Sequence, residues 1–171
     1  MKVDRATFQT WIASLARHAG VDRREAASLA EVLVWSDMIG RPEQGVWRLP
    51  TYLKRFKRGL ISSPSKPRTM ARKKAVALLD GRNGFGQVVG RLAMGQAIRL
   101  AEKFGVGVVG VKRSNHFGPA AYFVNQAAEK GYLGLAFSNA TPRVAPAGYA
   151  APLLGTNPIA LAAPRRTGRA V

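Results

Sequence analysis

The sequence predicts an α/β protein in which a helical N-terminal region precedes strands that alternate with helices. Apolar residues recur at helical spacing across residues 4–56. From residue 76 onward, short apolar segments alternate with longer amphipathic ones, a pattern typical of strand–helix–strand units with some parallel pairing. Two prolines and three serines in residues 62–67 separate the two patterns. We therefore expect a domain boundary near residue 70.

The helical region, residues 1–70, is predicted to contain three helices. Asp4 is placed to cap the first helix and Gly20 to end it, because glycine adopts positive φ without strain. Asp22 followed by Glu25 is the pattern of a capping box, which begins a second helix that extends toward Met38. After a break rich in glycine, a third helix is indicated by apolar residues at helical spacing around Pro50, namely Leu49, Tyr52, Leu53 and Phe56.

The following domain, residues 71–171, is predicted to contain four strands and two helices. Each strand is a short apolar segment bounded by turn residues, and each helix has its apolar positions broadly on one side. We expect strands at residues 76–79, 106–111, 133–137 and 159–163, and helices at residues 87–103 and 120–130.

The formal charge of +18 is the most unusual property of the composition. Such a charge attracts phosphate-rich partners, including nucleic acid and anionic lipid. The basic residues form short clusters, however, and lack the interleaved aromatic residues that stack on bases. Solvated helix faces and loops explain them without such a partner, so nucleic-acid binding is kept only as an alternative. The clusters are Lys54-Arg55-Lys57-Arg58, Lys66-Arg68-Arg72-Lys73-Lys74 and Arg165-Arg166-Arg169.

The composition also predicts the compartment. The chain has no cysteine, which excludes disulfides and a thiolate zinc site, and we expect no metal. No uninterrupted apolar stretch is long enough to span a bilayer. The first five residues lack the apolar core of a secretory signal. We therefore expect a cytoplasmic protein without a membrane partner.

A glycine-rich segment, residues 80–86, lies between a predicted strand and a predicted helix. Its glycines would let a phosphate approach the backbone at the N-terminus of the helix. A tight connection between the two elements explains them as well. Gly84 and Gly86 are followed by Gly90, one residue too late for a Rossmann dinucleotide fingerprint. The residues alone favour the tight connection.

His116 is the candidate acid–base residue. It lies in the segment Ser114-Asn115-His116-Phe117-Gly118, after a predicted strand and before a predicted helix, where open α/β sheets place ligand chemistry. The neighbouring Ser and Asn can orient its ring, and an ordinary pKa of about 6.5 suits proton exchange with a hydroxyl group. A loop histidine held by backbone groups is the alternative, and the residues alone leave both open. For His18, at the end of the first predicted helix, we expect a structural role, because a cation there suits the helix dipole.

Two further groups of polar residues are placed to orient a ligand. The amides and hydroxyls of residues 138–141 and 154–158 lie beside predicted strands, although such residues also build ordinary turns. Arg48 and Tyr52 are four residues apart and therefore share a helical face. Arg can hold a carboxylate with two hydrogen bonds, and Tyr can donate to an oxygen atom. On their own, these two are better explained as a surface pair.

In combination, these segments resemble the malate/L-lactate dehydrogenase family, which also contains ureidoglycolate, sulfolactate and diketogulonate enzymes. Each motif is weak alone, but together they follow the family's order over nearly the whole chain. The resemblance implies a non-Rossmann nicotinamide-binding domain with helices on a mixed sheet, beside a largely helical region. It also implies a homodimer whose active sites draw on both subunits. The motifs are Arg48-Leu49-Pro50-x-Tyr52, Asn83-Gly84-Phe85-Gly86-Gln87, Ser114-Asn115-His116-Phe117-Gly118 and Leu154-Gly155-Thr156-Asn157-Pro158.

The function implied by the resemblance is that of an oxidoreductase. It would transfer a hydride between NAD or NADP and a small 2-hydroxy or 2-oxo acid of the malate or lactate type. His116 is then the catalytic acid–base residue, and the substrate-binding residues are Arg48, Tyr52 and Asn115. The choice between NAD and NADP and the identity of the acid stay open. The cofactor-binding residues are Ser138, Asn139, Ala140, Thr156 and Asn157.

The sequence departs from the family in two ways. Family members carry Ser-His-Gly before the Arg-Leu-Pro motif, with that His in the active site, whereas this chain has Glu43-Gln44-Gly45. Gln does not exchange a proton near neutral pH, so an acid–base role is lost there while a hydrogen-bonding role survives. The chain is also shorter than family members, and we expect a truncated member with an incomplete cofactor site. The alternative to an enzyme is a non-catalytic truncated relative that acts as an interaction or assembly subunit.

Overall fold

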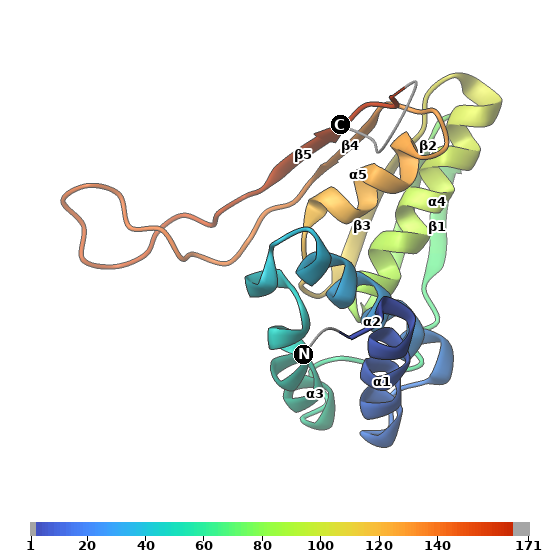
Figure 1. The fold of residues 1–171 in the computed structure, drawn as a ribbon. Helices are drawn as coiled ribbons and strands as arrows, with labels where there is room; N and C mark the ends of the chain where they lie inside the picture. Colours follow the sequence, from blue (N-terminus) through green and yellow to red (C-terminus); the bar gives the residue numbers. More distant parts are fainter. Residues whose placement is uncertain (1–2, 166–171) are drawn as a thin grey trace. The chain divides into compact units, whose positions relative to one another are not determined.

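The computed structural model describes residues 3–165 (Figure 1). The chain divides into two compact units, Met1–Pro119 and Ala120–Val171, and each is described by itself. The domain boundary near residue 70 stays a prediction. Arg166 and Arg169 of the last basic cluster, like the end of the predicted α/β domain, lie outside the described residues.

Two capped helices begin the first unit, as predicted. Helix α1 is Arg5–His18, and the Asp4 carboxylate accepts a hydrogen bond from the Thr7 amide at 3.0 Å. Helix α2 is Arg23–Met38, and the Asp22 carboxylate accepts from the first amides of that helix. Both caps satisfy amides that a helix leaves unpaired at its N-terminus, which is why both helices begin where the sequence predicted.

The second hydrogen bond of the predicted capping box, from the Asp22 amide to the Glu25 side chain, was predicted wrongly. Glu25 does not reach back to Asp22; its buried carboxylate accepts from the Ser63 hydroxyl at 2.5 Å and from the amide and hydroxyl of Ser65 at 2.8 and 2.7 Å. The Asp22 amide donates to the Ser63 hydroxyl oxygen at 2.9 Å. Hydrogen bonds to a carboxylate are the stronger kind, so they hold residues 62–67 against the start of α2.

The third predicted helix is also present and closes a helical core. Two short 3-10 helices, η1 (Pro42–Gln44) and η2 (Val46–Arg48), lead into α3 (Leu49–Lys57). Side chains of the three α-helices pack together with Phe85, which is fully buried although it follows the strand region. Residues on both sides of residue 70 therefore share this core, whose largest fully buried members are Phe85, Ile12, Leu29 and Leu33.

The sheet of the first unit is mixed, in the order β1-β2-β3. Strands β2 (Val76–Gly84) and β3 (Val108–Ser114) pair in parallel and are connected by α4 (Gly86–Phe104). This confirms the predicted strand–helix–strand unit, although β2 continues past its predicted end at residue 79. Strand β1 (Arg68–Lys73), which the sequence did not predict, pairs antiparallel with β2 at the edge, and all its residues are exposed.

The second unit is a helix on a two-stranded sheet. Helix α5 (Ala120–Ala128) contacts both β4 (Gly134–Phe137) and β5 (Ile159–Ala162), which pair antiparallel. The connection between the strands projects beyond them as a long hairpin, drawn in orange in Figure 1 and bridged once between Val144 and Leu154. Its exposed apolar side chains are Val144, Tyr149, Leu153 and Leu154.

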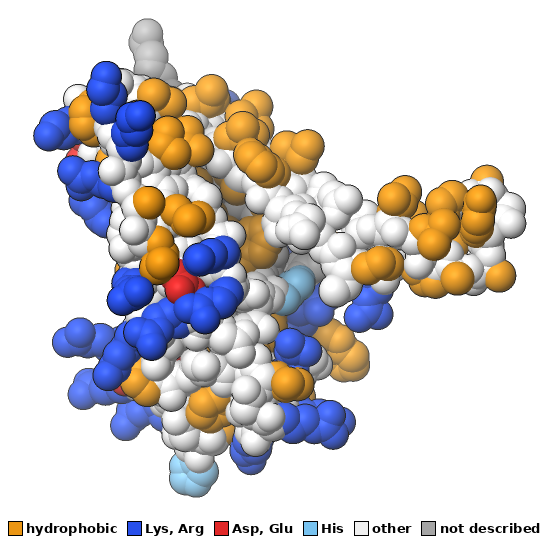
Figure 2. Space-filling view, turned by 180° about the vertical axis from the view of Figure 1, so that it is seen from behind, with side chains coloured by type: hydrophobic (Ala, Val, Ile, Leu, Met, Phe, Trp, Pro, Cys, Tyr) orange, Lys and Arg blue, Asp and Glu red, His pale blue; other side chains and the backbone are white. Residues whose placement is uncertain are grey.

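The surface is dominated by cations. Figure 2 shows blue side chains over much of the visible face and few red ones, consistent with 27 Lys and Arg against 9 Asp and Glu. Ion pairs in residues 3–165 join Arg41 to Glu43, Arg91 to Glu31 and Arg113 to Asp80. Within the same residues, no helix combines the length and apolarity needed to cross a membrane.

Candidate functional site

Helix α3 and the loop after β3 bring Tyr52 and His116 into contact. The Tyr52 hydroxyl oxygen lies 2.7 Å from Nδ1 of His116. Tyr52 is buried in the helical core, whereas His116 keeps contact with solvent although its ring is partly shielded by the protein. The predicted acid–base residue is therefore oriented by one of the predicted substrate residues and still accessible to a ligand.

A second hydrogen bond reaches the same nitrogen. The Gly118 amide donates to His116 Nδ1 at 3.3 Å. A backbone amide can only donate, whereas a tyrosine hydroxyl can donate or accept. In the neutral ring with its proton on Nε2, Nδ1 accepts from both groups. When Nδ1 carries a proton, Tyr52 becomes the acceptor. The Tyr52 hydroxyl thus supports both protonation states of the ring.

The third member of this group is Arg48. It lies just before α3, and its Nε donates to the Glu43 carbonyl oxygen at 2.7 Å, which fixes the guanidinium. Its positive charge acts on both neighbours. Desolvation, followed by the charge of Arg48, lowers the pKa of His116 to about 4. Burial raises the pKa of Tyr52 to about 12, although Arg48 acts in the opposite direction. At neutral pH the imidazole is neutral and the phenol is protonated.

Asn115 fixes the loop that carries His116. Its Nδ2 lies 3.0 Å from each of three acceptors, the carbonyl and side-chain oxygens of Asn83 and the carbonyl of Gly84. Its Oδ1 accepts from Arg55 at 3.3 Å. The side chain thereby ties the loop to the end of β2. Its role as a substrate contact stays a prediction, and its amide donors are engaged within the protein.

The glycine-rich segment is explained by the close approach of the same loop. A Cβ atom on Gly86 would lie 2.5 Å from the carbonyl oxygen of His116 and would also meet that of Asn115. Real Cβ atoms do not approach so closely, so only glycine fits at residue 86. This is the tight-connection interpretation, and the neighbour that requires it is the candidate catalytic loop.

Two glutamines lie around Gly118, of which Gln87 is fully buried and Gln44 half-buried. A Cβ on Gly118 would be 3.8 Å from Gln87 Nε2 and 3.9 Å from the Gln44 carbonyl oxygen. Gln87 is fully buried, and its side-chain amide interacts with the Tyr52 hydroxyl, which partly offsets the rise in the pKa of Tyr52. Within residues 3–165, Oε1 of Gln44, at the position where the family carries His, is buried without a hydrogen-bond partner. The sequence did not identify Gln87 as a site residue. The one signal for it was its place as the polar last residue of the motif Asn83-Gly84-Phe85-Gly86-Gln87.

The predicted cofactor residues form a separate group in the second unit. Asn157 Oδ1 accepts from the Ala140 amide at 2.9 Å, which joins the two polar segments. The Ser138 hydroxyl donates to the Asn139 carbonyl oxygen at 2.8 Å. Asn139 and Thr156 are exposed. The structure thus brings residues 138–141 and 154–158 together, while their binding role stays a prediction.

Comparisons with known proteins identify the family of the chain. The sequence profile described as malate/L-lactate dehydrogenase matches residues 3–171. The chain is 43% identical to a malate dehydrogenase of Pyrococcus abyssi over 86% of this chain and 41% of that protein. It is 38% identical to a ureidoglycolate dehydrogenase (NAD(+)) of Escherichia coli K12 over 96% of this chain and 47% of that protein.

Solved structures show the same likeness. The structure of malate dehydrogenase from Pyrococcus horikoshii superposes with a TM-score of 0.93 at 38% identity, covering 98% of this chain and 48% of that chain. Malate dehydrogenase from Entamoeba histolytica gives 0.93 at 34% identity, covering 99% and 47%. The chain therefore spans about half the length of the relatives it matches.

Proposed function

Because the chain belongs to the malate/L-lactate dehydrogenase family, we propose that it supplies the acid–base site of a cytoplasmic oxidoreductase acting on a small 2-hydroxy or 2-oxo acid, with NAD or NADP as cofactor. The observation that carries this proposal is the contact between Tyr52 and His116 beside the charge of Arg48. This group combines a proton-exchanging ring, a hydroxyl that orients it and a cation for a carboxylate.

Arg48 is the proposed carboxylate-binding residue. Its Nε is used by the Glu43 carbonyl, so the guanidinium is held while its terminal nitrogens stay available to a substrate carboxylate. A bound carboxylate also neutralises the charge that contributes to the low pKa of His116. Substrate binding therefore removes the second of the two causes that lower the pKa of His116, after desolvation, and moves this pKa in the direction of neutral pH, where a general acid–base group is most effective.

His116 is the proposed proton carrier. In the oxidation direction, the neutral ring carries its proton on Nδ1, which donates to the Tyr52 oxygen, so that Nε2 has a free lone pair. The bond between the substrate hydroxyl oxygen and its hydrogen then breaks, and the proton passes to Nε2. In the reduction direction, the same Nε2 returns the proton to the carbonyl oxygen. NAD(P) supplies the hydride chemistry at the substrate carbon when it is bound. Tyr52 acts through His116 and is a positioning residue.

The second unit is the proposed location of cofactor contacts. Asn157 holds the two polar segments together. The exposed Asn139 amide and Thr156 hydroxyl then offer donors and acceptors suited to a carboxamide such as that of nicotinamide. Ser138 and Ala140 lie in the same segment. These groups fit the polar end of the cofactor.

The first experiment is a titration of the purified chain with NADH and with NADPH, followed by nicotinamide fluorescence. Saturable binding of either supports the cofactor assignment and selects the cofactor for a screen of 2-oxo acids. Turnover that is lost in His116→Ala and retained in His18→Ala supports the catalytic assignment. If a folded chain binds neither cofactor, the proposal fails for these residues alone.

We also propose a homodimer, supported by the exposed apolar side chains of the hairpin between β4 and β5. In Figure 2, orange side chains gather on the projecting part of the molecule. Light scattering after size exclusion would give twice the chain mass, and a monomer at all concentrations would contradict it.

A non-catalytic assembly subunit is the second candidate, favoured by Gln44 at the position of the family's His. Tight binding to a longer family member without cofactor binding would support it. Cofactor-dependent turnover by this chain alone would exclude it.

A further inference from the structure

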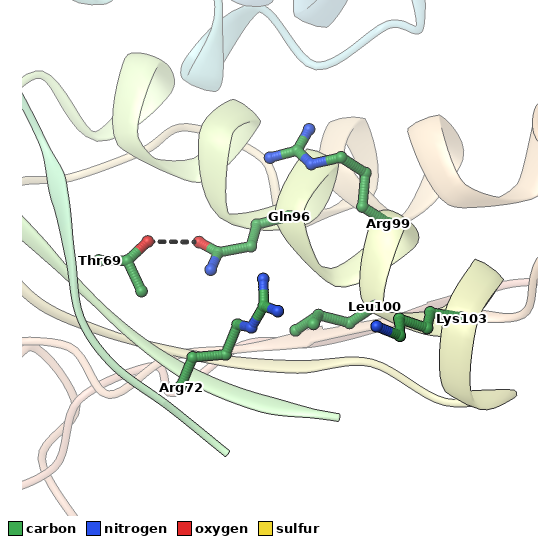
Figure 3. A pocket seen from close by; sticks show the side chains of 6 residues that line it. All are labelled: Thr69, Arg72, Gln96, Arg99, Leu100 and Lys103. Carbon is green, nitrogen blue, oxygen red and sulfur yellow. Dashed lines mark hydrogen bonds between the residues drawn. The ribbon is translucent and has the colours of Figure 1, made fainter. Parts of the chain in front are cut away.

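A basic pocket lies between the edge strand β1 and helix α4, away from the residues used above. Its volume is about 320 Å³, at the lower end of the range of about 300–1,000 Å³ for small-molecule sites. Figure 3 shows Thr69 and Arg72 on the strand side of the pocket, while the other side chains follow one another along α4. The lining residues are Thr69, Arg72, Gln96, Arg99, Leu100 and Lys103.

A β-bulge gives the strand side of this pocket its shape. Thr69 and Arg72 are three residues apart, so in a regular strand they would point to opposite faces. Pairing with β2 passes from Thr69–Leu79 directly to Ala71–Leu78, which leaves Met70 as an extra residue. The extra residue reverses the alternation beyond it. Thr69 and Arg72 therefore both face α4.

The spacing of residues along α4 forms the helix side of the pocket. Gln96, Arg99 and Lys103 recur at intervals of three and four residues and so share one face of α4. The Thr69 hydroxyl pairs with Gln96 Oε1 at 3.3 Å, which leaves the Gln96 Nε2 hydrogens free to donate. Apart from this contact and the apolar Leu100, the lining consists of hydrogen-bond donors that carry positive charge.

Within residues 3–165, no acidic side chain forms an ion pair with the pocket's cations. Glu102 is adjacent in sequence to Lys103 but does not line the pocket. Lys103 lies over the ring of Phe104, at 5.3 Å from its centre. Like charges held together repel, so an anion that bridges them is bound with a gain in Coulomb energy. A phosphate group offers several acceptor oxygens to guanidinium donors.

We propose that this pocket binds a small anion carrying two or three linked phosphate groups. Cations contributed by two different elements offer contacts to more than one phosphate group, and a single pocket bounded by six residues suits a compact ligand better than a long polymer. The source is inorganic pyrophosphate or the diphosphate of a nucleotide. The proposal is independent of the dehydrogenase site, since it uses none of the same residues.

The test is calorimetric titration of the full chain with inorganic pyrophosphate at low and moderate salt. The double variant Arg72→Gln/Arg99→Gln removes two lining charges. The matched control Lys73→Gln/Lys74→Gln removes two charges from the adjoining residues without touching the lining. We expect affinity to fall by about tenfold for each lining arginine, which corresponds to loss of a charge-assisted hydrogen bond. The control should differ from wild type by less than about threefold.

Further ligands identify the source. ADP that competes with pyrophosphate and loses affinity in the same double variant would assign the pocket to a nucleotide diphosphate; pyrophosphate binding without ADP binding would assign it to the inorganic anion. Equal weakening in the control variant, or no pyrophosphate binding at low salt by a chain with a normal thermal melt, would overturn the proposal. So would oligonucleotide binding that tightens with length and ignores Arg72 and Arg99.

Discussion

Replacing Tyr52 by Phe tests the contact on which the proposed acid–base chemistry depends. The substitution deletes the hydroxyl that lies 2.7 Å from His116 Nδ1 and keeps the ring that packs in the helical core. A hydrogen bond to a charged group contributes about 1.5–3 kcal/mol. If the bond is lost only from the protonated ring, kcat falls by roughly 10- to 150-fold, with a smaller change in KM.

A second measurement does not need activity. The chain contains two histidines, so ¹⁵N signals of the ring in a His18→Gln background report on His116 alone. In the parent chain we expect His116 to titrate below its ordinary value, because desolvation and Arg48 lower its pKa to about 4. In Tyr52→Phe the pKa falls further, because the imidazolium loses its acceptor while the neutral ring keeps the Gly118 amide.

Tyr132→Phe is the matched control, since Tyr132 is half-exposed and lies outside both the His116 site and the hairpin. It should leave both the His116 titration and kcat unchanged. An identical His116 titration in Tyr52→Phe and the parent chain would refute the contact. A full kcat in Tyr52→Phe would refute its role in positioning the ring.

Three further predictions concern stability. Glu25→Ala should lower the free energy of unfolding by about 3 kcal/mol, because the Ser63 and Ser65 donors lose a buried acceptor; urea denaturation measures this, exposed Glu43→Ala is the control, and equal midpoints would show that the cluster contributes nothing. Gly86→Ala should lower the midpoint of thermal unfolding, because its Cβ would lie 2.5 Å from the His116 carbonyl oxygen; an unchanged midpoint would contradict this close approach. Stability should also fall as the pH decreases from 6.5 toward about 4, because the lowered pKa of His116 means that the unfolded chain takes up a proton that the folded chain does not. Above pH 6.5 both states are neutral at His116 and the effect vanishes, so melts of His116→Gln should show a weaker pH dependence than those of the parent chain.

The sequence predicted the elements whose signals are local. Asp4 and Asp22 mark helix starts because a cap acts on amides two or three residues away. The capping-box prediction for Glu25 was wrong because local spacing does not reveal distant partners. Its carboxylate accepts hydrogen bonds from Ser63 and Ser65. Strand β1 was missed because three of its six residues are basic and all six are exposed. It forms by pairing with β2 and leaves no apolar alternation to detect.

The site residues were also predictable only where local sequence patterns indicate them. Position after a strand indicated His116, and helical spacing indicated Arg48 and Tyr52. Nothing local indicated that Tyr52 would contact a ring 64 residues later in the chain; only the family resemblance placed them in one site. The requirement for glycine at residue 86 could not be predicted from residues 80–86 either. The atoms that exclude a side chain there belong to the loop around His116.

The basic residues of β1 also oppose pairing between this edge strand and a second copy of the chain. An edge strand presents unpaired backbone groups that invite a strand from another molecule, and such pairing begins many aggregates. Here the exposed edge carries Arg68, Arg72 and Lys73, so two copies that approach edge to edge repel each other. Because salt screens such repulsion over about 8–10 Å at moderate ionic strength, concentrated stocks of this chain should remain clear at low salt and become turbid as salt is added.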